Sequence, residues 1–395
     1  MAIPPPESAA AARRRAALRF IVCLGLVSLF ADMTYEGARS IIGPYLQVLG
    51  ASGFEMGLVI GLGEMCAASL RYLSGRLADR TRAYWLLTIV GYCINLLAVP
   101  ALALASSWQA AALLVIAERT GKAVRVPSRD VLLSGATAEV GHGWGFALHN
   151  AMDQTGAVIG PLWVALAVAR THVISRAFMP LAIPAVAALT ALFVARAFQP
   201  PAAAPAPASA SRQLPAVFWM YVAAAGLLAF GYLDFPFFAY YWVRHALFSN
   251  AWIPVLYAAA MAGEGLTGLL FGRLFDRWGV AILAAATLVS LWSLPLGFLG
   301  GPGLALGALA CWAVGTGAQS VCMKSGIAQV VSMDRRGTAF GSFYAVFGVL
   351  WFAGSALLGW LLDHHLLVMV AVGMAAQAAA AVLFFILRRG NAPAG

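Results

Sequence analysis

Long apolar stretches recur along the whole chain and constrain its fold more than any other feature. Each stretch holds about twenty or more residues, the length that a helix needs to cross a lipid bilayer. The apolar residues are contiguous and lack the strict alternation of a membrane β-barrel, so they predict helices. The stretches fall at 17–43, 54–75, 83–105, 108–131, 143–168, 177–198, 216–243, 251–272, 280–299, 302–331, 338–361 and 366–388.

The composition supports the same fold class. Hydrophobic residues make up 62% of the chain and charged residues only 10%, whereas a soluble domain carries about 25% charged residues. The five cysteines all lie in apolar stretches, and no C-x-x-C pair occurs among them, so we interpret them as packing residues. We predict an all-α membrane protein with twelve transmembrane helices and no metal or other cofactor.

The net charge of +10 comes from an uneven distribution of arginine. If the N-terminus is cytoplasmic, only Arg170, Arg176 and Arg244 lie on the far side of the membrane. An excess of basic residues on the cytoplasmic side is typical of multi-pass membrane proteins, so both termini are predicted to be cytoplasmic, in a bacterial inner membrane. The charge therefore reflects topology, and no nucleic-acid partner is predicted. The cytoplasmic set is Arg13, Arg14, Arg15, Arg19, Arg76, Arg80, Arg82, Arg129, Arg196, Arg212, Arg273, Arg277, Arg335, Arg336, Arg388 and Arg389.

The chain divides into two similar parts. The Pro- and Ala-rich segment 199–215 predicts an exposed cytoplasmic linker between residues 1–198 and 216–395, each with six expected helices. Short motifs recur in order at nearly one spacing: GRLADR at Gly75 and GRLFDR at Gly272 are 197 residues apart. A duplicated six-helix unit, with its copies related by an axis along the membrane normal, is a transporter architecture.

These two loops resemble the G-x-L-x-D-R signature of the major facilitator superfamily, and with the helix count the resemblance covers essentially the whole chain. It implies two pseudo-symmetric six-helix bundles that alternate between inward-open and outward-open states, with the substrate between them. It also implies a conformational latch at the loops, because their charges can bind nearby helix ends in one state only. The latch residues are Gly75, Asp79, Arg80, Arg82, Gly272, Asp276 and Arg277.

A second motif, GAVIGP at 156–161, resembles the antiporter signature of exporters in that superfamily. Gly156 and Gly160 lie one turn apart and allow a neighbouring helix to approach closely, while Pro161 removes a backbone hydrogen bond. The motif favours export and a prokaryotic, exporter-like branch. The fourth stretch departs from the exporter pattern, because Arg119 there stands among many more charges than the signature has.

Three charged residues interrupt the first apolar stretch. Asp32, Glu36 and Arg39 are spaced at i, i+4 and i+7, so they share one helical face. Because each charge within a membrane span costs roughly 2.5 to 3.5 kcal/mol, we expect this face to point into a central cavity. Asp32 is expected near mid-membrane as a substrate or proton contact, with Glu36 and Arg39 as an ion pair. An internal salt-bridge network that only orders the helix is the alternative.

Asp234 is the counterpart in the seventh stretch, in the sequence YLDFPFF. Pro236 can break the helix beside it, and broken helices near mid-membrane often mark binding sites. The aromatic residues around Asp234 form a wall in this interpretation, although aromatic residues are also enriched at membrane interfaces.

Further ionisable residues lie inside the predicted spans. Isolated carboxylates that are held away from water can exchange protons near neutral pH, as proton coupling requires. His149 and Asp153, four residues apart, form either a proton relay or a satisfied core hydrogen bond. In the fourth stretch Glu118 and Lys122 have the spacing of an ion pair, and Arg119 can serve an anion in the cavity. The complete set of these additional candidates is Glu64, Glu118, Arg119, Lys122, His149, Asp153, Glu264 and Lys324.

These observations predict a secondary active transporter and no enzyme, because the chain lacks a P-loop and an H-E-x-x-H motif. We expect a monomer that exports a small, partly hydrophobic compound in exchange for protons. One alternative is an importer or facilitator of an organic anion that uses Arg39, Arg119 and Lys122. Others are a divalent-metal exporter that uses Asp32 and Asp234, and a non-transporting membrane sensor.

Overall fold

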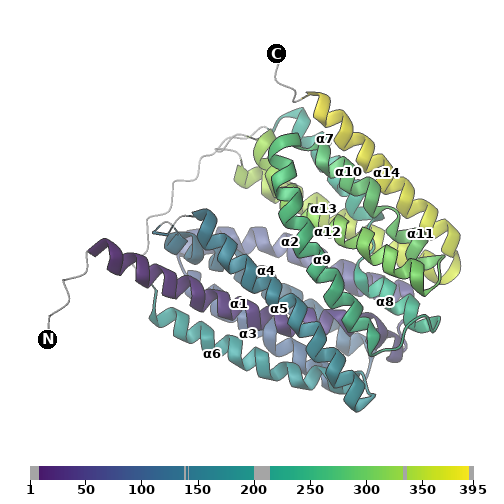
Figure 1. Cartoon of the computed structure of the whole chain (residues 1–395), viewed down its shortest axis with the longest axis horizontal. Helices are drawn as coiled ribbons and strands as arrows, with labels where there is room; N and C mark the ends of the chain where they lie inside the picture. The colour runs from purple at the N-terminus through teal and green to yellow at the C-terminus, as the bar shows by residue number, and fades with distance from the viewer. Residues whose placement is uncertain (1–8, 138, 141, 200–213, 332–335, 391–395) are drawn as a thin grey trace.

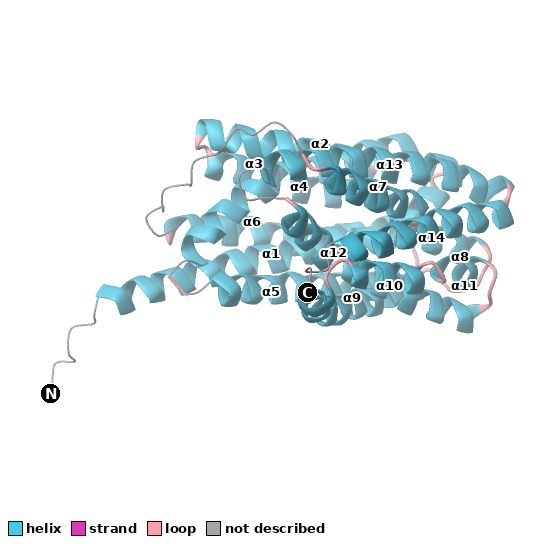
Figure 2. Cartoon of the chain, turned by 90° about the horizontal axis from the view of Figure 1, so that it is seen from above, coloured by secondary structure: helices cyan, strands magenta, loops and turns pink. Residues whose placement is uncertain are grey.

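The computed structural model describes residues 9–137, 139–140, 142–199, 214–331 and 336–390. In this part of the chain helices are joined by short loops, and Figure 2 shows no strand among them. Eleven helical segments are long and apolar enough to cross a membrane. The helix over 108–137 makes the twelfth crossing by position, and its many charges set it apart from the other eleven. The predicted all-α membrane fold is therefore confirmed.

The helices of residues 1–198 are α1 (Ala9–Val48), α2 (Gly53–Thr81), α3 (Tyr84–Ala101), α4 (Trp108–Thr137), α5 (His142–Thr171) and α6 (Ala182–Ala197), with short 3-10 helices at Leu102–Leu104 and Ser175–Leu181. Those of residues 216–395 are α7 (Ala216–Gly231), α8 (Phe235–Arg244), α9 (Trp252–Trp278), α10 (Ala281–Ser290), α11 (Ser293–Phe298), α12 (Pro302–Val330), α13 (Arg336–His364) and α14 (Leu366–Gly390).

Two of the expected single spans are broken. The seventh consists of α7 and α8, and the ninth consists of α10 and α11. Pro236 occupies the first turn of α8, where its missing N–H costs no hydrogen bond, and it would break a continuous helix. Pro295 in α11 has no N–H to donate to Leu291, where the second break lies. Proline therefore accounts for both interruptions.

The first six helices pack against one another, as do the last eight. The most extensive contacts between the two groups join α2 with α13, α5 with α9, and α1 with α8, and smaller ones join α1 with α9 and α2 with α8. In Figure 1 α1 starts at the left and α14 ends at the top, whereas α8 lies toward the right. We call the end of the bundle where α1 begins and α14 ends the terminal end, and the opposite end the far end. The boundaries of the two halves stay a prediction, and most of the expected linker lies outside the described residues.

Glycine allows α2 and α13 to approach closely. Gly53, Gly57 and Gly61 are spaced by four residues and share the face of α2 that meets α13. A Cβ atom on Gly61 would lie only 3.0 Å from the Cα atom of Phe352, and one on Gly53 would lie 2.8 Å from a backbone oxygen of α13. Small residues are typical of such membrane contacts, where packing drives helix association. The two groups of helices are therefore closely packed at the far end.

Candidate functional site

The charged stripe of α1 faces the inside of the helix bundle, as the spacing predicts. Asp32 and Glu36 are buried, and the Arg39 side chain is only 18% exposed. Glu36 and Arg39 contact other helices, so they tie α1 to α2, α4 and the second half of the chain. The expected ion pair between Glu36 and Arg39 is not among the described contacts, because both side chains have partners on other helices.

Asp32 interacts with its own helix. The hydroxyl of Tyr35, one turn further along α1, donates a hydrogen bond to Asp32 Oδ1. No lysine or arginine in the described part of the chain forms an ion pair with this carboxylate, in agreement with its expected lack of a local cation. Asp32 is thus a buried acid with a neutral hydrogen-bond partner.

Glu36 joins the two groups of helices. The Tyr257 hydroxyl of α9 donates a hydrogen bond of 2.5 Å to Glu36 Oε2, and Lys122 Nζ of α4 lies 3.7 Å from Glu36 Oε1. The Lys122 ammonium also stands 3.9 Å from the centre of the Tyr35 ring, a cation–π contact. Lys122 therefore binds α1, and the pairing with Glu118 that its sequence spacing indicates is replaced by this contact.

Arg39 forms the second tie between the groups, an ion pair with Asp234. Asp234 is only 3% exposed and caps α8, because its Oδ1 accepts a hydrogen bond of 2.8 Å from the backbone N–H of Phe235. The helix break at Pro236 frees that N–H, so the sequence YLDFPFF creates both the cap and the charged site. Arg39 Nη2 also lies 3.7 Å from Glu64 Oε1 of α2.

Glu64 extends the network to α4. Arg119 Nη1 lies 3.0 Å from Glu64 Oε1, and Arg119 Nε lies 3.2 Å from Glu118 Oε2. Asn95 of α3 donates a hydrogen bond of 2.8 Å to Glu118 Oε1. Arg39 and Arg119 thus share the Glu64 carboxylate. This shared carboxylate connects Arg39 to α2 and, through Arg119, to α4.

Arg125 of α4 is fully buried and unusual. Its guanidinium carbon stands 4.2 Å from the centre of the Tyr92 ring and 5.7 Å from that of Tyr35. None of its three guanidinium nitrogens has a hydrogen-bond partner in the described structure. Two aromatic faces therefore hold this cation in place of a carboxylate.

His149 and Asp153 form the expected contact on α5, with 3.7 Å between His149 Nδ1 and Asp153 Oδ2. The other ring nitrogen, Nε2, lies 3.0 Å from the hydroxyl oxygen of Ser28 on α1. Arg129 Nη1 donates a hydrogen bond of 3.2 Å to the same hydroxyl. The four residues form a continuous polar chain between α4, α1 and α5.

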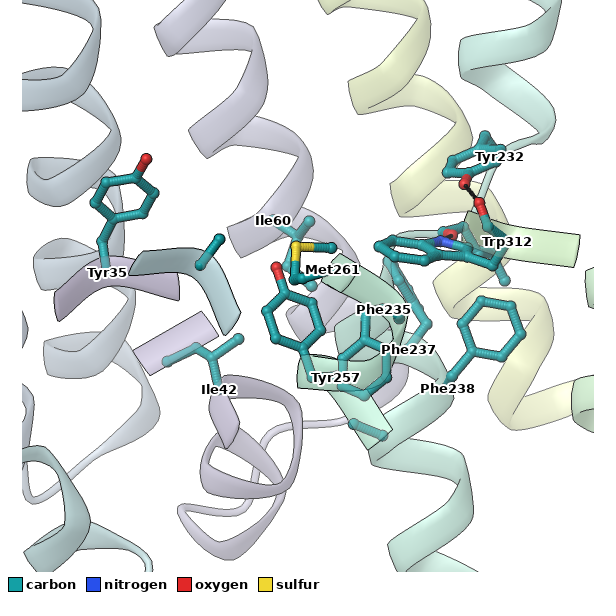
Figure 3. Close-up of a cluster of buried hydrophobic side chains, with 14 of the residues drawn as sticks. Tyr35, Ile42, Ile60, Tyr232, Phe235, Phe237, Phe238, Tyr257, Met261 and Trp312 are labelled. Carbon is teal, nitrogen blue, oxygen red and sulfur yellow. Dashed lines mark hydrogen bonds between the residues drawn. The ribbon is translucent and has the colours of Figure 1, made fainter. Parts of the chain in front are cut away.

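Glu264 lies on α9 and is half-buried. Among the described residues its carboxylate has no hydrogen bond or ion pair. Beside it, Gln154 of α5 donates a hydrogen bond of 2.5 Å to the backbone oxygen of Met261. Tyr257 of the same helix packs against further aromatic rings, and Figure 3 shows Tyr257, Phe235 and Trp312 in a row that ends at Tyr232.

The glycines of the GAVIGP motif allow α5 to lie against α1. A Cβ atom on Gly156 would be 3.1 Å from the Cβ atom of Asp32, and one on Gly160 would be 2.7 Å from the Cα atom of Met33. Pro161 lies inside α5, directly after this contact. The close approach predicted from the motif is present, and it is located at the stripe of α1.

The GRLADR motif lies apart from this network, in the last turns of α2, at the terminal end of the bundle. Asp79 and Arg80 are exposed and, with Arg76 and Leu77, line an open groove of about 780 Å³. Tyr84 donates a hydrogen bond of 3.4 Å to Asp79, and no ion pair of Asp79 is found in the described part. A latch formed by Gly75, Asp79, Arg80 and Arg82 therefore stays a prediction.

The second copy of the loop is described only in part. Gly272 lies against Val321 of α12, and Arg277 is exposed. The side chains of Asp276 and Lys324 lie outside the described residues, so their predicted roles stay open.

The sequence pattern predicted the acidic and basic residues of the site but not the neutral residues that contact them. Four such neutral residues each contact a charged member of the network: Tyr35, Tyr92, Asn95 and Tyr257. The only signal for Tyr257 is its position seven residues before Glu264, on the same face of α9. In the described part no three His, Cys, Asp or Glu side chains converge as metal ligands would.

Comparisons with known proteins agree with this architecture. Residues 24–355 match the model of the Major Facilitator Superfamily. An uncharacterized protein of Mycobacterium tuberculosis (strain ATCC 25618 / H37Rv) is 40% identical over 383 residues, 94% of each chain. An uncharacterized MFS-type transporter of Methanocaldococcus jannaschii is 30% identical over 140 residues, 35% of each chain.

Solved structures share the fold at low sequence identity. A mutant of the nucleoside transporter NupG aligns with a TM-score of 0.77 at 13% identity, over 93% of this chain and 99% of that one. A POT family transporter in complex with 5-aminolevulinic acid aligns with a TM-score of 0.75 at 12% identity, over 93% and 95% of the two chains. The chain belongs to the major facilitator superfamily and is a secondary transporter of a small molecule across a membrane.

Proposed function

We propose that this transporter exchanges protons for a small, partly hydrophobic organic compound, which it exports across a bacterial inner membrane. The observation that carries the proposal is the ion pair between Arg39 and Asp234. It joins α1 to the helix break between α7 and α8, so it lies between the two groups of helices that alternating access moves apart. An ion pair at such a position links protonation to conformation.

The physical argument starts from the cost of burial. Removing one partner of a buried ion pair costs about 3 to 5 kcal/mol, because the other charge stays in a medium of low polarity. A proton on Asp234 removes that partner without changing any covalent contact. Arg39 then still has Glu64, at 3.7 Å, which belongs to its own half. Protonation therefore weakens the tie between the halves while Arg39 remains compensated.

The second tie supports the same cycle. Tyr257 and Glu36 join α9 to α1 by a hydrogen bond, and Glu36 also faces Lys122. If the halves separate, Glu36 keeps its lysine just as Arg39 keeps Glu64. Glu36 and Arg39 thus each keep a partner of opposite charge within the first half when the halves separate. A two-state element needs such partners in order to open without leaving a buried charge uncompensated.

Three features support the direction and the setting. The glycine contact between α5 and α1 is the one that the exporter-type motif predicts, and it places the motif beside Asp32. The arginine distribution favours cytoplasmic termini. The exposed charges of the GRLADR loop are available to act as a latch at that side of the membrane. We infer that the chain functions as a monomer with one central pathway.

Proton exchange can be measured in proteoliposomes that contain a pH-sensitive dye. A compound that stabilises the purified protein against heat is added to one side, and we expect it to drive proton movement in the opposite direction. Asp234→Asn should abolish this coupled proton movement. Asp130→Asn is the matched control, because Asp130 pairs with Arg129 but is 47% exposed. Compound flux that is identical with and without a pH gradient would refute proton coupling.

A further inference from the structure

Arg125 of α4 is the one arginine or lysine that is fully buried in the described part of the chain. Its guanidinium nitrogens Nε, Nη1 and Nη2 have no hydrogen-bond partner among the described residues. The other basic residues of α4 that face the network do have acidic partners, because Arg119 binds Glu64 and Lys122 faces Glu36. Arg125 is therefore a buried cation without a carboxylate beside it.

The surrounding helices offer no free acid to Arg125. The helices that pack against α4 are α1, α2, α3 and α5, and every acidic side chain on these helices and on α4 itself is described. Helix α3 has no acidic residue. The acids of the other four helices each have another partner, and they are Asp32, Glu36, Glu55, Glu64, Asp79, Glu118, Asp130 and Asp153. Water can accept the N–H groups of Arg125, but it does not neutralise a charge, and an uncompensated charge inside a membrane protein is strongly unfavourable.

Two tyrosine rings surround the guanidinium without neutralising it. The guanidinium carbon lies 4.2 Å from the centre of the Tyr92 ring and 5.7 Å from that of Tyr35. Such rings attract a cation but carry no net charge. The Tyr35 hydroxyl is donated to Asp32, whereas the buried Tyr92 hydroxyl has no partner in the described structure. Helix α3 lies directly against α4 here, because a Cβ atom on Gly91 would be 2.7 Å from the backbone nitrogen of Arg125.

Two further hydroxyl groups lie one helical turn away. Ser128 follows Arg125 by three residues on α4, and Thr88 precedes Tyr92 by four residues on α3. Both are fully buried, and neither hydroxyl has a partner among the described residues. A serine or threonine within a helix often donates to the carbonyl one turn back, as Thr190 does. A cation and three hydroxyl donors without an acid are the groups that bind an anion.

We propose that Arg125 is the centre of an anion site, in which the hydroxyls of Thr88, Tyr92 and Ser128 are further donors. The ligand is a small anion, either a halide ion or a carboxylate group, because the site is fully buried. The guanidinium neutralises the anion, and its planar fork of N–H groups suits a carboxylate in particular. The site goes beyond the proposed proton exchange, since it lies within the first six helices and apart from the ion pair between Arg39 and Asp234.

The test measures the thermal midpoint of the purified full chain in detergent micelles at constant ionic strength. Chloride or acetate replaces methanesulfonate, a bulkier anion, in increasing proportion. A ligand that binds only the folded chain raises its stability, so we expect a saturable rise in the midpoint. A rise with chloride assigns the site to a free inorganic ion, and a rise with acetate alone assigns it to the carboxylate of an organic compound.

Three variants locate the effect. Arg125→Leu should abolish the dependence on the anion and still fold, because an apolar side chain in place of a buried charge is well tolerated. Thr88→Val keeps the shape of the side chain but removes its hydroxyl, and it should weaken the apparent anion affinity severalfold. Arg170→Gln, at an exposed arginine outside the site, is the control and should respond as the unmodified chain does.

Two results would overturn the proposal. One is a midpoint that depends on neither anion, which would point to Asp32 as the counter-charge of Arg125 in another conformation, because both residues contact Tyr35. The other is the same anion dependence in Arg125→Leu as in the unmodified chain. Because no gradient is present, the measurement is independent of proton exchange. A saturable anion effect without proton exchange in proteoliposomes would refute the proposed coupling and leave this site standing.

Discussion

The ion pair between Arg39 and Asp234 makes a quantitative prediction for a double-mutant cycle. Asp234→Asn removes the negative charge but keeps a side chain that caps α8, because asparagine accepts the Phe235 N–H as well as aspartate does. Arg39→Gln removes the positive charge. The two single variants and the double variant together isolate the interaction from the cap and from the contact with Glu64.

The magnitude follows from burial. Asp234 is 3% exposed and the Arg39 side chain 18% exposed, so the pair is of the kind whose disruption costs about 3 to 5 kcal/mol. Glu64 at 3.7 Å compensates Arg39 in part, which places Asp234→Asn at the lower end, about 3 kcal/mol. Once Arg39 is gone, Asp234→Asn should cost much less, with a coupling free energy of about 1 to 3 kcal/mol.

Reversible unfolding in mixed micelles, followed by tryptophan fluorescence, measures the four free energies of unfolding. The matched control is the cycle of Arg129→Gln and Asp130→Asn, because that pair lies 2.8 Å apart with a 47% exposed aspartate. Its coupling should be at most about 1 kcal/mol. Additive effects of Arg39→Gln and Asp234→Asn would show that the pair does not hold the halves together, and the proposed switch would lose its basis.

Three further predictions concern the helix contact, the second tie and the loop. Gly160→Ala places a Cβ atom 2.7 Å from a backbone atom of α1 and should lower stability by about 1 to 3 kcal/mol and slow transport. Gly135→Ala is its control, because that Cβ atom meets nothing within 4 Å and should leave the thermal midpoint unchanged or higher. Tyr257→Phe removes the 2.5 Å hydrogen bond to Glu36 and should cost about 1 to 3 kcal/mol in unfolding experiments; an unchanged midpoint would contradict the described tie. Asp79→Asn should slow turnover in proteoliposomes and leave ligand affinity in micelles unchanged, and a parallel loss of affinity would argue against a latch that is remote from the site.

Helical periodicity predicts faces, and on this point the sequence was informative. It placed Asp32, Glu36 and Arg39 on one buried face of α1, because a lipid-facing stripe of charge is too costly. It also placed Asp234 at a helix break, because Pro236 lacks the N–H that a continuous helix requires. The break between α10 and α11 was not anticipated, although Pro295 is its local cause.

Helical periodicity does not predict which helices pack against each other. It therefore could not assign the partners of the buried charged residues. The expected pairs were local ones, Glu36 with Arg39 and Glu118 with Lys122, since only positions on one helix can be compared without a fold. The structure pairs Arg39 with Asp234 and Glu36 with Tyr257, residues that are 195 and 221 positions apart.

The sequence by itself determined the class of this protein: its apolar stretches are long enough to cross a bilayer only as helices, and duplicated loops mark two related halves. The tertiary structure alone decided how its buried charges are used. The energy of a buried charge depends on what lies within a few ångströms of it, and those neighbours come from helices that are distant in the chain. For that reason only the packed bundle shows that Arg39 pairs with Asp234 and that Glu36 accepts a hydrogen bond from Tyr257.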